Sequence, residues 1–123
     1  MSTIEIKSED NFIIISVNGK LTATRFIETA TGNYASGTVK NVIWNLSHGS
    51  LQLLSTGDLK TIAHAVSISC RDGIRTGGKT IFVASADEDY YLLCTYIALI
   101  APKSLPIEYH VCRFMVDARE WLK

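Results

Sequence analysis

Apolar residues recur along the chain with two different periods, and the period indicates the kind of element. Alternating or continuous short apolar runs predict strands, whereas apolar residues three, four and seven positions apart predict helices. The predicted strands cover residues 3–7, 12–17, 39–46, 80–84 and 107–112. The predicted helices cover residues 21–30, 59–70 and 90–101. A fourth helix closes the chain, with Asp117 and Glu120 as capping residues and three apolar side chains expected to be buried: Ala118, Trp121 and Leu122.

Residues typical of helix ends delimit the predicted helices. Thr22 can cap the first helix, and the Gly32-Asn33 pair is typical of its end. Ser85, with Glu88 three positions later, has the spacing of a capping box at the start of the third helix. These signals support the predicted helices independently of the apolar spacing.

The order of the predicted elements, β-β-α-β-α-β-α-β-α, is typical of a single α/β domain over residues 1–123. Strands joined through helices run parallel with right-handed crossovers, and a hairpin joins antiparallel strands. The sequence therefore predicts an open, mixed five-stranded sheet, mostly parallel with an antiparallel first strand. In such sheets functional sites gather at the loops that follow the carboxyl ends of the strands. Here these loops are residues 47–55, 85–89 and 113–117.

The helix predicted over residues 90–101 is apolar on nearly every side, because Thr95 is its one strongly polar side chain. Its inner stripe, expected to pack on the sheet, contains Tyr90, Leu93, Ile97 and Ile100. The opposite stripe has the composition of a protein interface, with aromatic and aliphatic side chains and few charges. This candidate interface consists of Glu88, Tyr91, Leu92, Thr95, Ala98 and Leu99. The alternative is that the closing helix or the loop 47–55 folds over this stripe and buries it.

Composition and charge exclude several classes of partner. Twelve basic and twelve acidic residues give a formal net charge of zero, so no nucleic-acid partner is expected. The apolar helix is shorter than the roughly 20 residues that cross a bilayer, so no membrane insertion is expected. The cysteines (Cys70, Cys94 and Cys112) form no Cys-x-x-Cys pair and the histidines lack ligand spacing, which disfavours a disulfide framework or a metal site. The first residues lack a signal-peptide pattern, which favours the cytoplasm.

One stretch matches a nucleotide-binding motif. Residues 73–80, GIRTGGKT, fit the phosphate-loop pattern G-x-x-x-x-G-K-[ST]. That loop binds phosphate between a preceding strand and a following helix, and the predicted order here is the reverse. No nucleotide or other cofactor is therefore expected. Ser47 and His48 are adjacent, which is awkward for a nucleophile and its base, so no enzymatic activity is expected.

Several short segments of the sequence, taken in order, resemble those of the anti-sigma-factor-antagonist or STAS domain, especially its SpoIIAA-like branch. They are GKLT at 19–22, VIWNL at 42–46, GGKTIFVAS at 77–85, and the ending in which Asp117-Ala118 precedes Trp121-Leu122. The match runs nearly end to end. The resemblance implies the STAS fold and, for antagonists, a protein-binding switch phosphorylated on a serine at the start of the second helix. SpoIIAA-like relatives are often small stand-alone domains.

On this pattern Ser55 occupies the phospho-acceptor position. A phosphate at a helix N-terminus is stabilised locally, and its charge can disrupt a docked partner. The chain departs from the pattern at Leu54, where the antagonists carry aspartate. The alternative is that Ser55 only caps its helix, with Asp58 at the third helical position.

Taken together, these features predict a non-catalytic protein-interaction or regulatory module that forms a homodimer through Tyr91, Leu92, Thr95 and Leu99. A small apolar, lipid-like ligand is the alternative partner, since an apolar helix can also line one side of a binding pocket. A third hypothesis is a switch controlled by phosphorylation of Ser55.

Overall fold

The structure, a computed structural model, describes residues 2–9, 12–36, 41–69, 78–103 and 107–122. Within these residues, five strands form one sheet in the order β1-β2-β3-β4-β5. The strands are β1 (Thr3–Ser8), β2 (Phe12–Lys20), β3 (Asn41–Ser50), β4 (Gly78–Val83) and β5 (Ile107–Cys112). β1 runs antiparallel to β2 and all other neighbours run parallel, which confirms the predicted mixed sheet.

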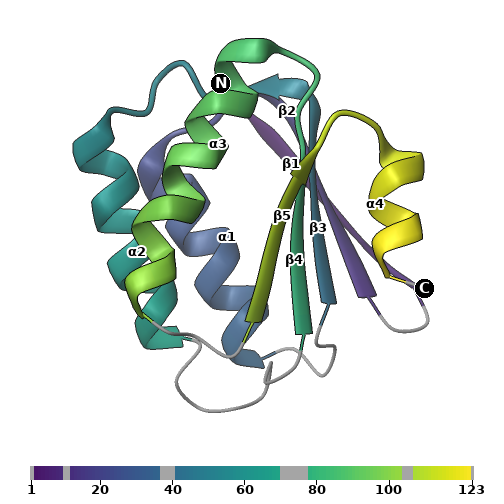
Figure 1. Cartoon of the computed structure of the whole chain (residues 1–123), viewed down its shortest axis with the longest axis horizontal. Coiled ribbons are helices and arrows are strands. Elements are labelled where there is room, and N and C mark those ends of the chain that lie inside the picture. Colours follow the sequence, from purple (N-terminus) through teal and green to yellow (C-terminus); the bar gives the residue numbers. More distant parts are fainter. Residues whose placement is uncertain (1, 10–11, 37–40, 70–77, 104–106, 123) are drawn as a thin grey trace.

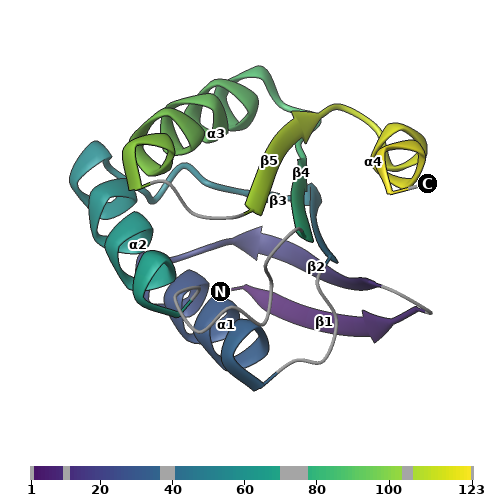
Figure 2. The same cartoon turned by 60° about the horizontal axis from the view of Figure 1, so that its bottom comes forward.

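The helices lie in two layers, one on each face of the sheet. They are α1 (Ala23–Ser36), α2 (Thr56–Ser69), α3 (Asp87–Ile100) and α4 (Met115–Trp121), and a 3₁₀ turn, η1 (Ala101–Lys103), follows α3. From β2 onward, each strand lies beside the strand that precedes it in the chain, and always on the same side. Because the crossovers between parallel strands are right-handed, the helices that they contain lie on one face of the sheet. Figures 1 and 2 show α1, α2 and α3 on that face and α4 on the other.

The strand order never reverses across the sheet. Open α/β sheets bind ligands in the crevice formed where the strand order reverses. Among the described strands, the carboxyl edge of the sheet therefore lacks the ligand-binding crevice that a reversal of strand order would form.

The main core lies between the sheet and α1, α2 and α3, and it is built around four buried aromatic side chains. Phe26 stacks on Trp44 with ring centroids 4.6 Å apart, and Phe82 meets Tyr96 edge-on at 5.8 Å. A smaller cluster on the opposite face packs beneath α4, and its buried members are Ile14, Ile43, Ile81, Val83 and Ala118. Both faces of the central strands are therefore apolar, which explains their continuous apolar runs.

β1, β2, β3 and α1 extend beyond their predicted ends. β3 continues to Ser50 because its last residues pair with an equally extended β2, as in the Gly19–Gly49 pair. α1 passes Gly32-Asn33 and ends at Ser36. A glycine inside a helix costs only about 1 kcal/mol, so it does not oblige the helix to end. The predicted start of β3 at residue 39 and the predicted end of α2 at residue 70 lie outside the described residues.

The predicted cap of α1 is confirmed and that of α3 is wrong. The Arg25 amide donates a hydrogen bond of 3.2 Å to Thr22 Oγ1, so Thr22 caps α1 as predicted. The residue that precedes α3 is Ala86, which makes no side-chain capping bond, so Ser85 and Glu88 form no capping box.

α4 also differs from its prediction. It begins after Phe114, so Asp117 lies in its first turn and does not cap it. Ala118 is buried as predicted, and Leu122 is half-buried against the smaller cluster. Trp121 was predicted to be buried but is 45% exposed. A helix of two turns presents too little surface to bury all three side chains on the sheet.

Candidate functional site

The three loops predicted to carry function are joined to one another at the carboxyl edge of the sheet. The Leu51 amide, in the β3–α2 loop, donates a hydrogen bond of 3.0 Å to the Asp89 carboxylate in the first turn of α3. Arg113, after β5, donates to the Ser85 carbonyl at 3.1 Å and to the Asp87 carboxylate at 2.6 Å. These contacts assemble three distant segments of the chain into one surface.

Asp89 anchors the loop that leads into α2. Its side chain is buried, with only 6% of the residue exposed. Burial away from water raises the pKa of this carboxyl, the hydrogen bond from Leu51 lowers it, and the charge of Glu88 raises it further. Two features favour the buried carboxylate, namely the Leu51 amide and its place at the positive end of α3. The hydrogen bond spans 38 positions of sequence and has no local sequence signal.

Arg113 fixes the end of β5 against α3. Besides its two hydrogen bonds, the guanidinium lies 4.2 Å from the centroid of the Tyr90 ring. Cation–π contacts of this kind contribute about 0.5–1 kcal/mol at exposed sites. The contact holds Tyr90 toward β5, where it is half-buried.

Ser55 is exposed at the start of α2 and forms a reciprocal cap with Asp58. The Asp58 amide donates to Ser55 Oγ at 3.1 Å, and the Ser55 amide donates to the Asp58 carboxylate at 2.9 Å. The predicted capping role of Ser55 is therefore confirmed. Leu54, which stands where the antagonists carry aspartate, is buried in the main core. The phospho-acceptor role of Ser55 stays a prediction.

The outward face of α3 is narrower than predicted. The helix buries Asp89, Leu93, Tyr96 and Ile100, while Tyr90 and Ile97 are half-buried. Of the candidate interface, Leu92 and Leu99 are half-buried and pack against the main core, which corrects their placement on the outward stripe. The exposed members are Glu88, Tyr91, Thr95 and Ala98. The outward apolar area thus depends mainly on Tyr91.

Large apolar side chains are nevertheless exposed along the carboxyl edge. Leu53 is 50% exposed, Tyr91 64% and Phe114 66%. We call Leu53, Ser55, Tyr91 and Phe114 the carboxyl-edge surface. Sequence reasoning missed Leu53 and Phe114, and the signal for both is an apolar residue within a polar loop that follows a strand.

Other chemistry considered from the sequence finds little support in the described residues. Residues 73–77 of the phosphate-loop pattern lie outside them, and its last residues, Gly78, Lys79 and Thr80, lie within β4, so the motif leads into a strand where a phosphate loop needs a helix. Among the described residues, no three His, Cys, Asp or Glu side chains are grouped to hold a metal ion. Within the same residues, each helix is too short or too polar to cross a membrane.

The hollows of the surface differ in lining and size, and one of about 410 Å³ is lined by Ser2, Lys20, Thr22, Arg25 and Leu53. One of about 650 Å³ is lined by four charged side chains, Lys79, Arg113, Asp117 and Glu120, together with Tyr90, Val111, Cys112 and Trp121. Another of about 510 Å³ lies on the α4 face, and its lining includes Glu5, Lys7 and Arg119. A hollow between α3 and β5 measures only about 200 Å³, whereas ligand pockets typically measure about 300–1,000 Å³.

Comparison with known proteins identifies the fold. The chain superposes on the anti-sigma factor antagonist SpoIIAA, in a structure of its unphosphorylated form, with a TM-score of 0.57 and 11% identity over 98% of this chain and 97% of that one. It superposes on an anti-sigma factor antagonist from Mycobacterium paratuberculosis with a TM-score of 0.58 and 19% identity over 98% of this chain and 93% of that one. Neither a protein-family model nor a curated protein sequence matches the chain. The SpoIIAA-like fold expected from the sequence is thus confirmed.

Proposed function

We propose that this chain is a non-catalytic regulatory module that binds a partner protein on its carboxyl-edge surface. The observation that carries this proposal is the exposure of Leu53 and Phe114 on loops, and of Tyr91 on α3, next to segments that hydrogen bonds join to one another. Exposed aromatic and aliphatic side chains on a preorganised scaffold are typical of the core of a protein interface.

The shape of the edge favours a protein over a small molecule. The strand order never reverses, so no switch-point crevice is present to enclose a ligand. The SpoIIAA-like fold is consistent with this function, since both similar structures are of anti-sigma factor antagonists. Asp89 and Arg113 fix the three loops in advance, which lowers the entropic cost of binding.

Phosphorylation of Ser55 would regulate this same surface. The hydroxyl is exposed and lies two residues from Leu53, so a phosphate there would place about two negative charges beside the docked partner. The Asp58 carboxylate accepts the Ser55 amide and would be repelled by a phosphate. Phosphorylation would therefore rearrange the cap as well as change the charge of the surface.

Quantitative affinity capture from the native cell tests the docking surface. Leu53→Arg and Tyr91→Arg are each expected to remove a partner that the unaltered chain retains. The matched control is Ile68→Arg, because Ile68 on α2 is 50% exposed, as Leu53 is, but lies outside the carboxyl-edge surface. If all three variants lose the partner equally, or if all three retain it, the proposed docking surface is wrong.

Two further measurements separate the alternatives. Ser55→Asp is expected to weaken binding of the captured partner, and unchanged affinity would mean that Ser55 is only a cap. Native mass spectrometry of freshly purified protein is expected to show no bound small molecule. A co-purified apolar compound would support a lipid-like ligand instead.

A further inference from the structure

The connection from β2 to α1 is a further part of the carboxyl edge. β2 ends at Lys20, which pairs with Ser50 at the end of the parallel strand β3. The next residue, Leu21, donates its amide to the Ser50 carbonyl at 2.9 Å. This hydrogen bond fixes the β2–α1 connection against the start of the β3–α2 loop, which carries Leu53 of the carboxyl-edge surface.

The hollow of about 410 Å³ lies at this connection and joins three segments of the chain. Ser2 comes before β1, Leu53 comes from the β3–α2 loop, and the other lining residues come from the end of β2 and the start of α1: Lys20, Thr22 and Arg25. We call this hollow the Lys20 hollow. Its volume lies within the range of about 300–1,000 Å³ that is typical of ligand pockets. Because Leu53 belongs to both, the Lys20 hollow continues the carboxyl-edge surface.

The Lys20 hollow carries positive charge that is not neutralised by the described part of the chain. Its lining there contains two exposed cations, Lys20 and Arg25, and no carboxylate. Neither cation forms an ion pair with a described residue, and the first turn of α1 contains no acidic side chain. The charge is local, since the chain as a whole has a formal net charge of zero.

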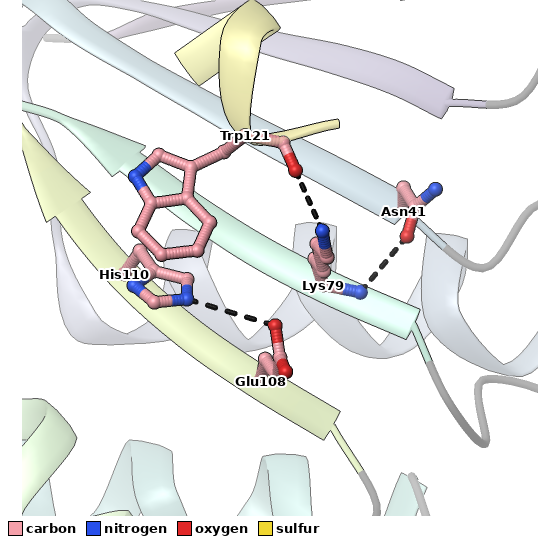
Figure 3. A network of polar contacts seen from close by, with 5 residues as sticks. All are labelled: Asn41, Lys79, Glu108, His110 and Trp121. Atoms are coloured by element: carbon pink, nitrogen blue, oxygen red, sulfur yellow. Dashed lines mark hydrogen bonds and ion pairs between the residues drawn. The ribbon is translucent and has the colours of Figure 1, made fainter. Parts of the chain in front are cut away.

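The cations of the hollow of about 650 Å³ are, by contrast, already engaged within the chain. Arg113 forms an ion pair of 2.6 Å with Asp87. Lys79 Nζ donates a hydrogen bond of 2.6 Å to the Trp121 carbonyl, as Figure 3 shows. That hollow is also lined by two carboxylates. The Lys20 hollow is therefore better suited to attract an anionic group.

The backbone holds the two cations of the Lys20 hollow in place. Gly19, directly before Lys20, has a φ of 86°, which glycine adopts without strain. Leu21, directly after it, is fully buried. Thr22 caps the first turn of α1 by accepting the Arg25 amide. Only the two side chains remain to be ordered on binding, which lowers its entropic cost.

We propose that the Lys20 hollow binds an acidic side chain of the partner protein, next to an apolar residue of the same segment that contacts Leu53. The proposal rests on the proposed docking function and adds the chemistry of the partner. Guanidinium and ammonium groups donate charge-assisted hydrogen bonds to carboxylates. Leu53 and the carbon stems of Lys20 and Arg25 supply apolar contact, which favours a peptide side chain over a free phosphate. Charge complementarity of this kind also fixes how a partner is oriented.

Amide NMR titration of the 123-residue chain with two short peptides tests the proposal without the partner. Both peptides have blocked ends; one alternates glutamate with leucine, and the other has lysine in place of glutamate. The glutamate peptide is expected to shift the amide signals of Lys20, Arg25 and Leu53, whereas the lysine peptide leaves them unchanged. Lys20→Gln and Arg25→Gln are each expected to weaken binding of the glutamate peptide about two- to fivefold, the effect of losing one exposed ion pair.

Charge reversal provides the sharper comparison. The double variant K20E/R25E is expected to lose the glutamate peptide and to bind the lysine peptide instead, which would also show that the variant folds. Lys7→Glu is the matched control, because Lys7 is an exposed lysine of β1 that pairs with Ile14, near the opposite end of β2 from Lys20. Lys7→Glu is expected to bind the glutamate peptide as the unaltered chain does, since distant exposed charges are screened by salt.

Three results of the titration would overturn the proposal. They are a glutamate peptide that shifts none of these signals, equal binding of the two peptides by the unaltered chain, and a loss with Lys7→Glu as large as that with the double variant. Inorganic phosphate is expected to shift the same signals less than the glutamate peptide at equal concentration, and a larger shift would assign the hollow to a phosphate group instead. Because the titration needs no captured partner, this proposal and the carboxyl-edge surface can fail separately.

Discussion

Removal of the Asp89 carboxylate tests how the carboxyl edge is held together. In Asp89→Ala the Leu51 amide loses its acceptor, and Leu51 itself is buried. A buried donor left without a partner costs about 1–3 kcal/mol. A domain of this size loses about 4 °C of midpoint temperature per kcal/mol, so we expect a drop of roughly 4–12 °C.

Two control variants separate the hydrogen bond from the charge. Asp89→Asn keeps an acceptor for Leu51 and is expected to remain within about 1 kcal/mol of the unaltered chain at neutral pH. Asp87→Ala removes a carboxylate from the same helical turn, but its ion pair with Arg113 lies at the surface, so we expect a loss of at most about 1 kcal/mol. Urea unfolding followed by Trp44 fluorescence measures all three, because Trp44 is fully buried. Equal losses for the two alanine variants would refute the anchoring role of Asp89.

The same carboxyl predicts a pH dependence of definite sign. Burial raises the pKa of Asp89 above its value in the unfolded chain, so between the two values the folded state holds more protons. Stability contributed by this group is then greatest at low pH and decreases as pH rises from about 4 through the folded pKa. Asp89→Asn removes this decrease, so its stability relative to the unaltered chain should rise with pH over that range. If the difference in stability between Asp89→Asn and the unaltered chain does not change with pH, the carboxyl of Asp89 has the same pKa in the folded and the unfolded chain.

Four other substitutions have expected outcomes. Gly49→Ala places a Cβ 2.9 Å from the Val17 carbonyl oxygen, so unfolding in urea should show a loss of about 1–3 kcal/mol. Gly32→Ala, with nothing within 4 Å of its added Cβ, should instead stabilise α1 by about 0.5–1 kcal/mol in the same assay. Ser55→Ala removes the cap of α2 and should cost about 0.5–2 kcal/mol in urea unfolding, with Ser55→Asp restoring most of it.

Most of the fold follows from patterns that are local in the sequence. Period and turn residues predicted the strands and α-helices of the described residues, though not the 3₁₀ turn η1, because each of those elements carries its own apolar spacing. The errors fall where a distant residue decides the outcome. Ser85 has the spacing of a helix cap, yet its carbonyl binds Arg113 from 28 positions away and the helix begins after Ala86. Trp121 has helical spacing, yet its ring packs on His110 at the rim of the sheet rather than beneath α4.

The candidate site was predictable in position but not in composition. Parallel topology alone predicts a functional site at the loops that follow the strands, and the structure joins those loops by hydrogen bonds. The candidate interface on α3 assumed that every side chain away from the sheet meets solvent. Leu92 and Leu99 instead pack against the core, because α3 also contacts the neighbouring helix α2.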